Sequence, residues 1–114
     1  MKIYQKILED VCIIIPHGRL DASNTHYIQK SLSEEAEKEG RVVMDLSSLE
    51  FLDSSGLGAI ISLLRRVKKN DGDMKLVCPA DKIRRVFELT RADRMFDIYD
   101  DCEVAAKSFP RGKA

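Results

Sequence analysis

The sequence predicts an α/β fold with a mixed β-sheet that has a parallel centre and begins with an antiparallel hairpin. Three observations lead to this prediction. β-rich and helical segments alternate along the chain, two residues separate the first two β-rich runs, and the later runs are short and mostly apolar. Two-residue turns join antiparallel strands, whereas apolar strands separated by helices are typical of parallel sheets. About four helices are expected, mainly covering one face of the sheet.

The first two strands are predicted at 3–8 and 11–15, because both runs contain residues that favour β-strands. Glu9-Asp10 forms the turn between them. Pro16 and Gly18 are expected to end the second strand, since both residues interrupt regular pairing.

One helix is predicted to begin at a cap among Ser23, Asn24 and Thr25 and to continue through Glu39. Its apolar stripe has a spacing of four residues, and its other face is acidic. Gly40 follows at the position where a glycine commonly ends a helix.

A central parallel strand is predicted at 41–46, followed by a polar turn and a short strand-like run at 49–52. The segment 53–58, Asp-Ser-Ser-Gly-Leu-Gly, then opens a long helix. Apolar residues from Leu57 to Val67 recur at helical spacing, and lysines occupy the last turn, where cations suit the helix dipole.

The last part of the chain is predicted to contain a buried strand at 74–78 and a helix capped by Asp81 that extends to Leu89. A short strand at 95–99 and a helix at 102–108 follow. We expect one domain over residues 1–109 and a short, frayed tail at 110–114.

Composition excludes several classes of protein. The 114 residues carry 19 basic and 19 acidic side chains, so a net charge of zero gives no bulk attraction to nucleic acid or anionic membranes. No apolar run is long enough to cross a bilayer, and the first residues do not lead us to expect a secretory signal. The three cysteines and two histidines have no metal-ligand spacing. We therefore expect a cytoplasmic protein without a metal or cofactor.

The charges are unevenly distributed along the chain. Residues 1–50 hold 6 basic and 9 acidic residues, and residues 51–114 hold 13 basic and 10 acidic residues. A bipolar surface that orients a charged partner is one interpretation, and solvated helix faces of opposite sign are the simpler one. The basic run of the long helix is assigned to such a solvated face: Arg65, Arg66, Lys68 and Lys69.

The start of the long helix is the most informative segment. A serine at this position lies beside unpaired backbone N–H groups at the positive end of the helix dipole. Ser54 is therefore either a capping residue or an acceptor of phosphate, because a dianion is tolerated there. No histidine or lysine base accompanies it, and Gly56 and Gly58 form no nucleotide-binding motif, so an enzyme is not expected.

The segment 42–58 resembles the signature of STAS domains, specifically of bacterial anti-sigma factor antagonists. Gly18-Arg19-Leu20-Asp21 and the segments 74–78 and 83–90 extend the resemblance over nearly the whole chain. In that family a partner that is both an anti-sigma factor and a serine kinase phosphorylates the serine directly after the aspartate. By position, the resemblance assigns this role to Ser54.

The resemblance implies a binding module that a phosphate switches off. The unphosphorylated form would bind a GHKL-type anti-sigma factor and serine kinase and release its sigma factor or other client. A PP2C-type phosphatase would reverse the modification, and the module would be a monomer or weak dimer. The residues expected at the partner surface around Ser54 are Asp21, Asp53, Ser55, Gly56, Leu57, Gly58 and Ile61.

Two alternatives stay open. The chain could be a scaffold subunit of a stressosome-like or transporter-associated assembly, which size-exclusion chromatography would distinguish from a small switch module. A small enzyme, such as a nucleotide hydrolase, is disfavoured because the sequence supplies no base, metal cluster or phosphate loop.

Overall fold

The computed structural model describes residues 1–110, and these form a mixed sheet of six strands with five α-helices and one 3-10 helix. The strands are β1 (Lys2–Leu8), β2 (Val11–Leu20), β3 (Arg41–Asp45), β4 (Leu49–Leu52), β5 (Asp73–Val77) and β6 (Ile98–Tyr99). The helices are α1 (Thr25–Lys30), α2 (Glu34–Glu39), α3 (Ser54–Lys68), α4 (Asp81–Leu89), the 3-10 helix η1 (Ala92–Met95) and α5 (Cys102–Lys107). The predicted tail at 110–114 lies, beyond Pro110, outside the described residues.

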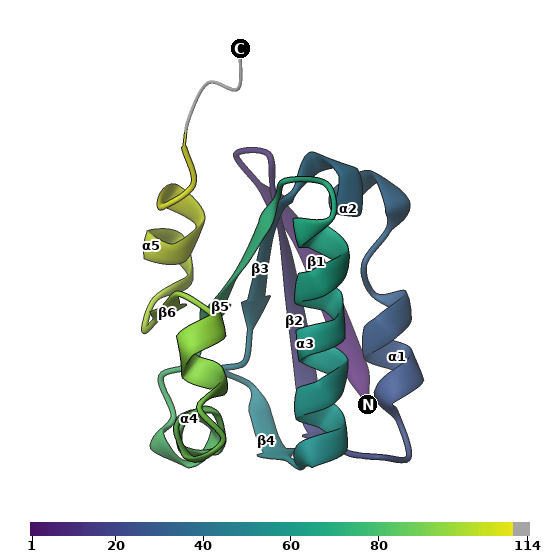
Figure 1. Ribbon diagram of the computed structural model, residues 1–114, viewed down its shortest axis with the longest axis vertical. Helices are drawn as coiled ribbons and strands as arrows, with labels where there is room; N and C mark the ends of the chain where they lie inside the picture. Colours follow the sequence, from purple (N-terminus) through teal and green to yellow (C-terminus); the bar gives the residue numbers. More distant parts are fainter. Residues whose placement is uncertain (111–114) are drawn as a thin grey trace.

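The sheet has the predicted topology. β1 and β2 form an antiparallel hairpin, and β2, β3, β5 and β6 follow in that order as parallel neighbours. The parallel strands all run downward in Figure 1, and β2 and β4 reach the lower edge of the molecule. No helix among the described residues is long and apolar enough to cross a membrane.

The predicted end of the second strand was wrong. β2 continues through Pro16 and Gly18 to Leu20, because a new parallel partner, β4, takes over where β3 stops. Gly18 has a φ of 96°, and the register shifts between Gly18 and Arg19. The glycine therefore bends the strand without ending it, since only glycine adopts this backbone conformation at low cost.

The predicted helix ending at Glu39 is two helices, α1 and α2, separated by Ser31–Ser33. The Ser31 hydroxyl donates to the Ile28 carbonyl at 2.6 Å, which competes with the next helical turn. Ser33 is extended and caps α2, with its hydroxyl accepting from the Ala36 N–H at 3.1 Å. Gly40 ends α2 in the left-handed conformation, as predicted.

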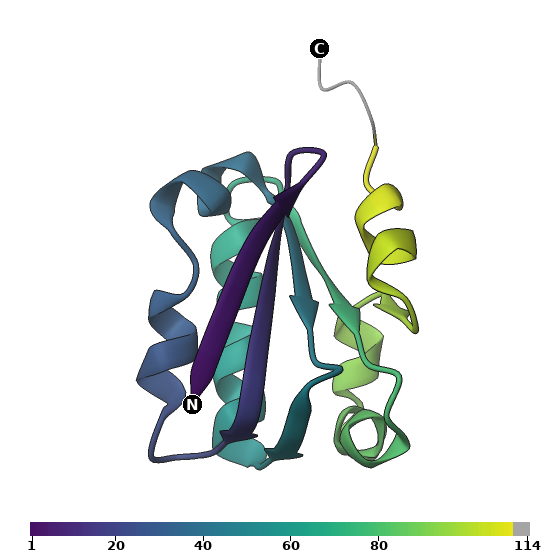
Figure 2. The ribbon, with the colours of Figure 1, turned by 180° about the vertical axis from the view of Figure 1, so that it is seen from behind.

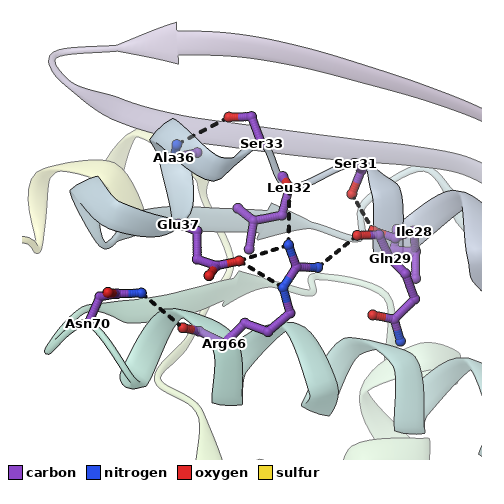
Figure 3. A network of polar contacts seen from close by, with 9 residues as sticks. All are labelled: Ile28, Gln29, Ser31, Leu32, Ser33, Ala36, Glu37, Arg66 and Asn70. Carbon is purple, nitrogen blue, oxygen red and sulfur yellow. Dashed lines mark hydrogen bonds and ion pairs between the residues drawn. The ribbon is translucent and has the colours of Figure 1, made fainter.

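Arg66 of α3 fills this break and was wrongly assigned to a solvated face. Its guanidinium donates to the carbonyls of Gln29 and Leu32 and to the Glu37 carboxylate, at distances between 2.8 and 3.3 Å (Figure 3). The two carbonyls lie at or just beyond the C-terminal end of α1, where no helical partner is available. Arg66 therefore ties α1 and α2 to α3.

The sheet separates two hydrophobic cores of unequal size. The larger core packs α1, α2, α3 and α4 against one face, and the smaller core packs α5 against the other. α5 contacts β3, β5 and β6, and it lies on the far side of the molecule from α1 and α2 (Figures 1 and 2). The expectation that helices mainly cover one face is confirmed, with α5 as the exception.

An ion-pair cluster lies beside the smaller core, with its lysine buried and its carboxylates partly exposed. The Lys75 ammonium donates to Asp97 at 2.8 Å and to Asp73 at 3.3 Å, and it is 5.1 Å from the centre of the Phe109 ring. Burial alone would lower the pKa of Lys75, but the two carboxylates outweigh it and the pKa is raised. The hydrogen bond from Lys75 in turn lowers the pKa of Asp97.

Two smaller expectations also need correction. Asp81 is the first residue of α4 and Ala80 occupies the cap position, so the aspartate does not cap the helix with its side chain. The strand predicted at 95–99 consists of the end of η1 and the two-residue strand β6. The left-handed conformation of Arg91, with a φ of 62°, starts η1 instead of a strand.

Candidate functional site

α3 begins at Asp53, which is its N-cap. The Asp53 carboxylate accepts from the Gly56 N–H at 2.8 Å, and the Asp53 carbonyl accepts from the Leu57 N–H at 2.9 Å. The hypothesis of a capping serine is therefore wrong, because Ser54 is the first helical residue. Within the described part of the chain the Ser54 hydroxyl has no hydrogen-bond partner, and the side chain is exposed.

The two aspartates of the predicted site meet at one edge of the sheet. β2 and β4 are parallel neighbours with Leu20 paired to Leu52, so Asp21 and Asp53 each follow a strand end. The Asp53 N–H donates to the Leu20 carbonyl at 3.4 Å. The loop after β2 and the start of α3 therefore lie side by side, at the lower edge in Figure 1.

Asp21 braces its own loop. Its carboxylate accepts from the Ser23 hydroxyl at 2.6 Å and from the Ser23 N–H at 3.0 Å, while the Asp21 N–H donates to the Asn24 side chain at 3.0 Å. The hydrogen bond from the Ser23 hydroxyl is the main cause of the lowered pKa of Asp21. This aspartate stays ionised and shapes the surface beside Ser54.

The remaining predicted residues divide into two groups. Ser55 and Gly58 are exposed, and Ile61 is half-buried on the next turn of α3. Gly56 and Leu57 are buried, and Leu57 belongs to the larger core. Gly56 and Leu57 therefore support the surface from below, while Ser54, Ser55, Gly58 and Ile61 form it.

The two glycines of the motif have different roles. A Cβ atom on Gly56 would lie 2.7 Å from the Leu20 carbonyl oxygen and 2.8 Å from the Leu52 Cδ1 atom, so α3 can approach β2 only without a side chain there. A Cβ atom on Gly58 would meet no atom of the described residues within 4 Å. Packing inside the domain therefore explains Gly56 and leaves Gly58 unexplained.

Sequence reasoning missed one pair at this edge. The Arg19 guanidinium stacks over the Phe51 ring, with 4.0 Å from Cζ to the ring centre, because the two residues are cross-strand partners in β2 and β4. Since the second strand was expected to end near Pro16, no pairing between Arg19 and Phe51 could be foreseen. Arg19 is exposed and adds a cation two residues before Asp21.

Cysteine and metal chemistry have no support at this edge. Burial raises the pKa of the Cys12 and Cys102 thiols and raises that of Cys78 to about 11, so all three are protonated at neutral pH. Within residues 1–110, no three histidine, cysteine, aspartate or glutamate side chains are grouped so that they could hold a metal ion.

A model of the STAS domain matches residues 2–105, which include every residue of this edge. The chain belongs to the STAS domain family. The predicted family is thereby confirmed. A protein of Thermotoga maritima with the provisional name anti-sigma factor antagonist is 34% identical to this STAS domain over 108 residues, which cover 93% of this chain and 96% of the relative.

Solved structures show the same fold. A crystal structure from Thermotoga maritima, also provisionally named an anti-sigma factor antagonist, superimposes on the STAS domain with a TM-score of 0.83 and 33% identity, covering 92% of each chain. The unphosphorylated form of the anti-sigma factor antagonist SpoIIAA has a TM-score of 0.69 at 22% identity and covers 93% of this chain and 94% of its own. The phosphorylated form of this Bacillus protein has a TM-score of 0.68 at 20% identity, covering 95% of this chain and all of its own.

Proposed function

We propose that this STAS domain is an anti-sigma factor antagonist switched by phosphorylation of Ser54. The unphosphorylated domain binds a GHKL-type anti-sigma factor and serine kinase and releases the client of that kinase, a sigma factor or another regulator. A PP2C-type phosphatase restores the binding form. The domain is the substrate of both enzymes and works in the cytoplasm, where the kinase has ATP.

One observation carries this proposal: the Ser54 hydroxyl is exposed and has no partner within residues 1–110, at the first position of α3 and directly after the capping Asp53. The name of the Thermotoga maritima relative supports the role of an anti-sigma factor antagonist, and the existence of a phosphorylated SpoIIAA supports its control by phosphate. Ser23, a competing serine outside the motif, already donates its hydroxyl to Asp21.

The switch needs no change of fold. A phosphate on Ser54 would lie at the positive end of the α3 dipole, where a dianion is compatible with the helix. It would also add nearly two negative charges beside the Asp53 carboxylate, on the surface formed by Ser55 and Gly58. A partner that closes over this surface would have to desolvate that charge, so the complex dissociates while the domain stays folded.

Phosphate is expected on Ser54 alone when the protein is incubated with its partner kinase and ATP. Mass spectrometry of the proteolysed product locates it. Ser54→Ala should abolish incorporation, and the matched variant Ser55→Ala should keep it. Phosphate found only on Ser55, Ser23 or Thr25 would contradict the assignment.

Gly58→Arg is expected to weaken kinase binding by about tenfold or more, because a long charged side chain would project from the exposed surface next to Ser54. Circular dichroism should stay unchanged, since no atom lies near the added Cβ. Gly58→Ala is the control, because it also removes the glycine but adds only a methyl group. If Gly58→Arg unfolds the domain, or binds as well as the unmodified protein, Gly58 is not part of the docking surface.

A further inference from the structure

A groove lies between the C-terminal half of α3 and the 3-10 helix η1. It has a volume of about 640 Å³. The lining side chains are Leu64, Arg65, Lys68, Lys69, Arg94 and Met95. We call this set the basic groove, because it holds four cations and no carboxylate.

Most of these cations are uncompensated. Lys68 is 3.8 Å from an Asp73 oxygen, and its side chain remains 56% exposed. Arg65, Lys69 and Arg94 form no ion pair with any described residue. Like charges held close together repel one another, and an anionic ligand bound in the groove would relieve this repulsion.

The α3 dipole does not account for this arrangement. Cations in the last turn of a helix are common because they complement its negative end, which explains Lys68 and Lys69. Arg94 comes from η1, a separate element, and adds its charge to the same groove. The Arg66 side chain, by contrast, is held by α1 and α2 and contributes nothing here (Figure 3).

The groove also has an apolar component. Met95 is 40% exposed although it is a large hydrophobic residue, and Leu64 lies beside it in the lining. A phosphate backbone or a lipid headgroup would pair with the cations alone. A peptide that combines carboxylates with an apolar side chain would use both features.

We propose that the basic groove binds an acidic segment of a partner protein, anchored by one apolar side chain against Met95. This site is distinct from the one at Ser54. The α3 residues of the groove, Leu64 to Lys69, lie 10 to 15 residues after Ser54, so at a rise of about 1.5 Å per residue they are separated from Ser54 by roughly 15–20 Å. The domain would thus hold a second partner contact that phosphorylation of Ser54 does not control.

The test uses a fluorescent glutamate-rich peptide with a single leucine, followed by fluorescence anisotropy at low salt. Lys69→Glu/Arg94→Glu should weaken binding by about tenfold or more. The control variant Lys82→Glu/Arg85→Glu replaces two exposed cations of α4 that lie outside the groove. It changes the net charge by the same amount as Lys69→Glu/Arg94→Glu, and it should weaken binding by less than about twofold. Met95→Ser should weaken it by about fivefold.

Further arms separate the alternatives. Ser54→Asp should leave peptide binding unchanged, so a failed switch at Ser54 does not affect this proposal. If both charge-reversal variants lose the same amount of affinity for the peptide, binding depends only on the net charge of the domain, and the proposal is overturned. So would peptide binding that survives Lys69→Glu/Arg94→Glu, or groove-dependent binding of polyuridylate or phosphatidylserine vesicles in place of the peptide.

Discussion

Ser54→Asp is expected to bind the partner kinase about tenfold or more weakly while its free energy of unfolding stays the same or rises. The added carboxylate lies at the first position of α3, where the helix dipole favours an anion by about 0.3–1 kcal/mol. The same charge lies next to Asp53 on the exposed surface. Stability and affinity should therefore change in opposite directions in one variant, as seen by thermal melting and calorimetric titration.

Ser54→Ala is the matched control for that experiment. Because Asp53 caps α3 and the Ser54 hydroxyl has no partner among the described residues, alanine should change stability by less than about 0.5 kcal/mol. Ser54→Ala should bind the kinase, and adding ATP should not release it because it has no hydroxyl at position 54 to accept the phosphate. Aspartate carries less charge than phosphoserine, so the phosphorylated protein is measured alongside. Unweakened binding by the phosphorylated protein would refute the electrostatic switch.

Gly56→Ala is expected to destabilise the domain by about 2 kcal/mol. The new Cβ atom would lie 2.7 Å from the Leu20 carbonyl oxygen, 2.8 Å from Leu52 Cδ1 and 2.9 Å from Leu20 Cγ. Such overpacking costs about 3 kcal/mol. The better helix propensity of alanine offsets about 1 kcal/mol of this. Urea denaturation measures the difference.

Gly58→Ala provides the comparison in the same helix. Its Cβ atom meets nothing within 4 Å, so only the gain in helix propensity remains, up to about 1 kcal/mol of stabilisation. Opposite signs for the two variants would confirm that only Gly56 is a packing glycine. Similar changes at both positions would contradict the close approach of α3 to β2.

The sequence was sufficient for the order of most elements because local signals are strong there. The apolar spacing from Leu57 to Val67 and the left-handed glycine Gly40 depend on near neighbours only. The break between α1 and α2 was missed although Ser31 and Ser33 lie at it, because part of its hydrogen bonding comes from Arg66, which is far along the chain. The extension of β2 to Leu20 likewise depends on its pairing with β4, and no local pattern reveals that pairing.

The candidate site divides in the same way. The motif from Asp53 to Gly58 is contiguous, so its place at a helix start was predictable. The division between buried Gly56 and exposed Gly58 was not, because it depends on how α3 lies against β2. The stacking of Arg19 on Phe51 required the cross-strand pairing of two segments distant in sequence.

The division of the hydrophobic interior by the sheet has a consequence for local unfolding. α5 has six residues and covers only the smaller core, so its detachment exposes few apolar side chains. The free energy needed to detach α5 is therefore lower than the free energy of unfolding the whole domain. Amide protons of α5 then exchange with solvent through this partial opening, whereas those in the middle of α3 exchange only when the larger core is lost. A domain that opens in this order keeps the start of α3, and with it Ser54, in place while its C-terminal helix is free to separate.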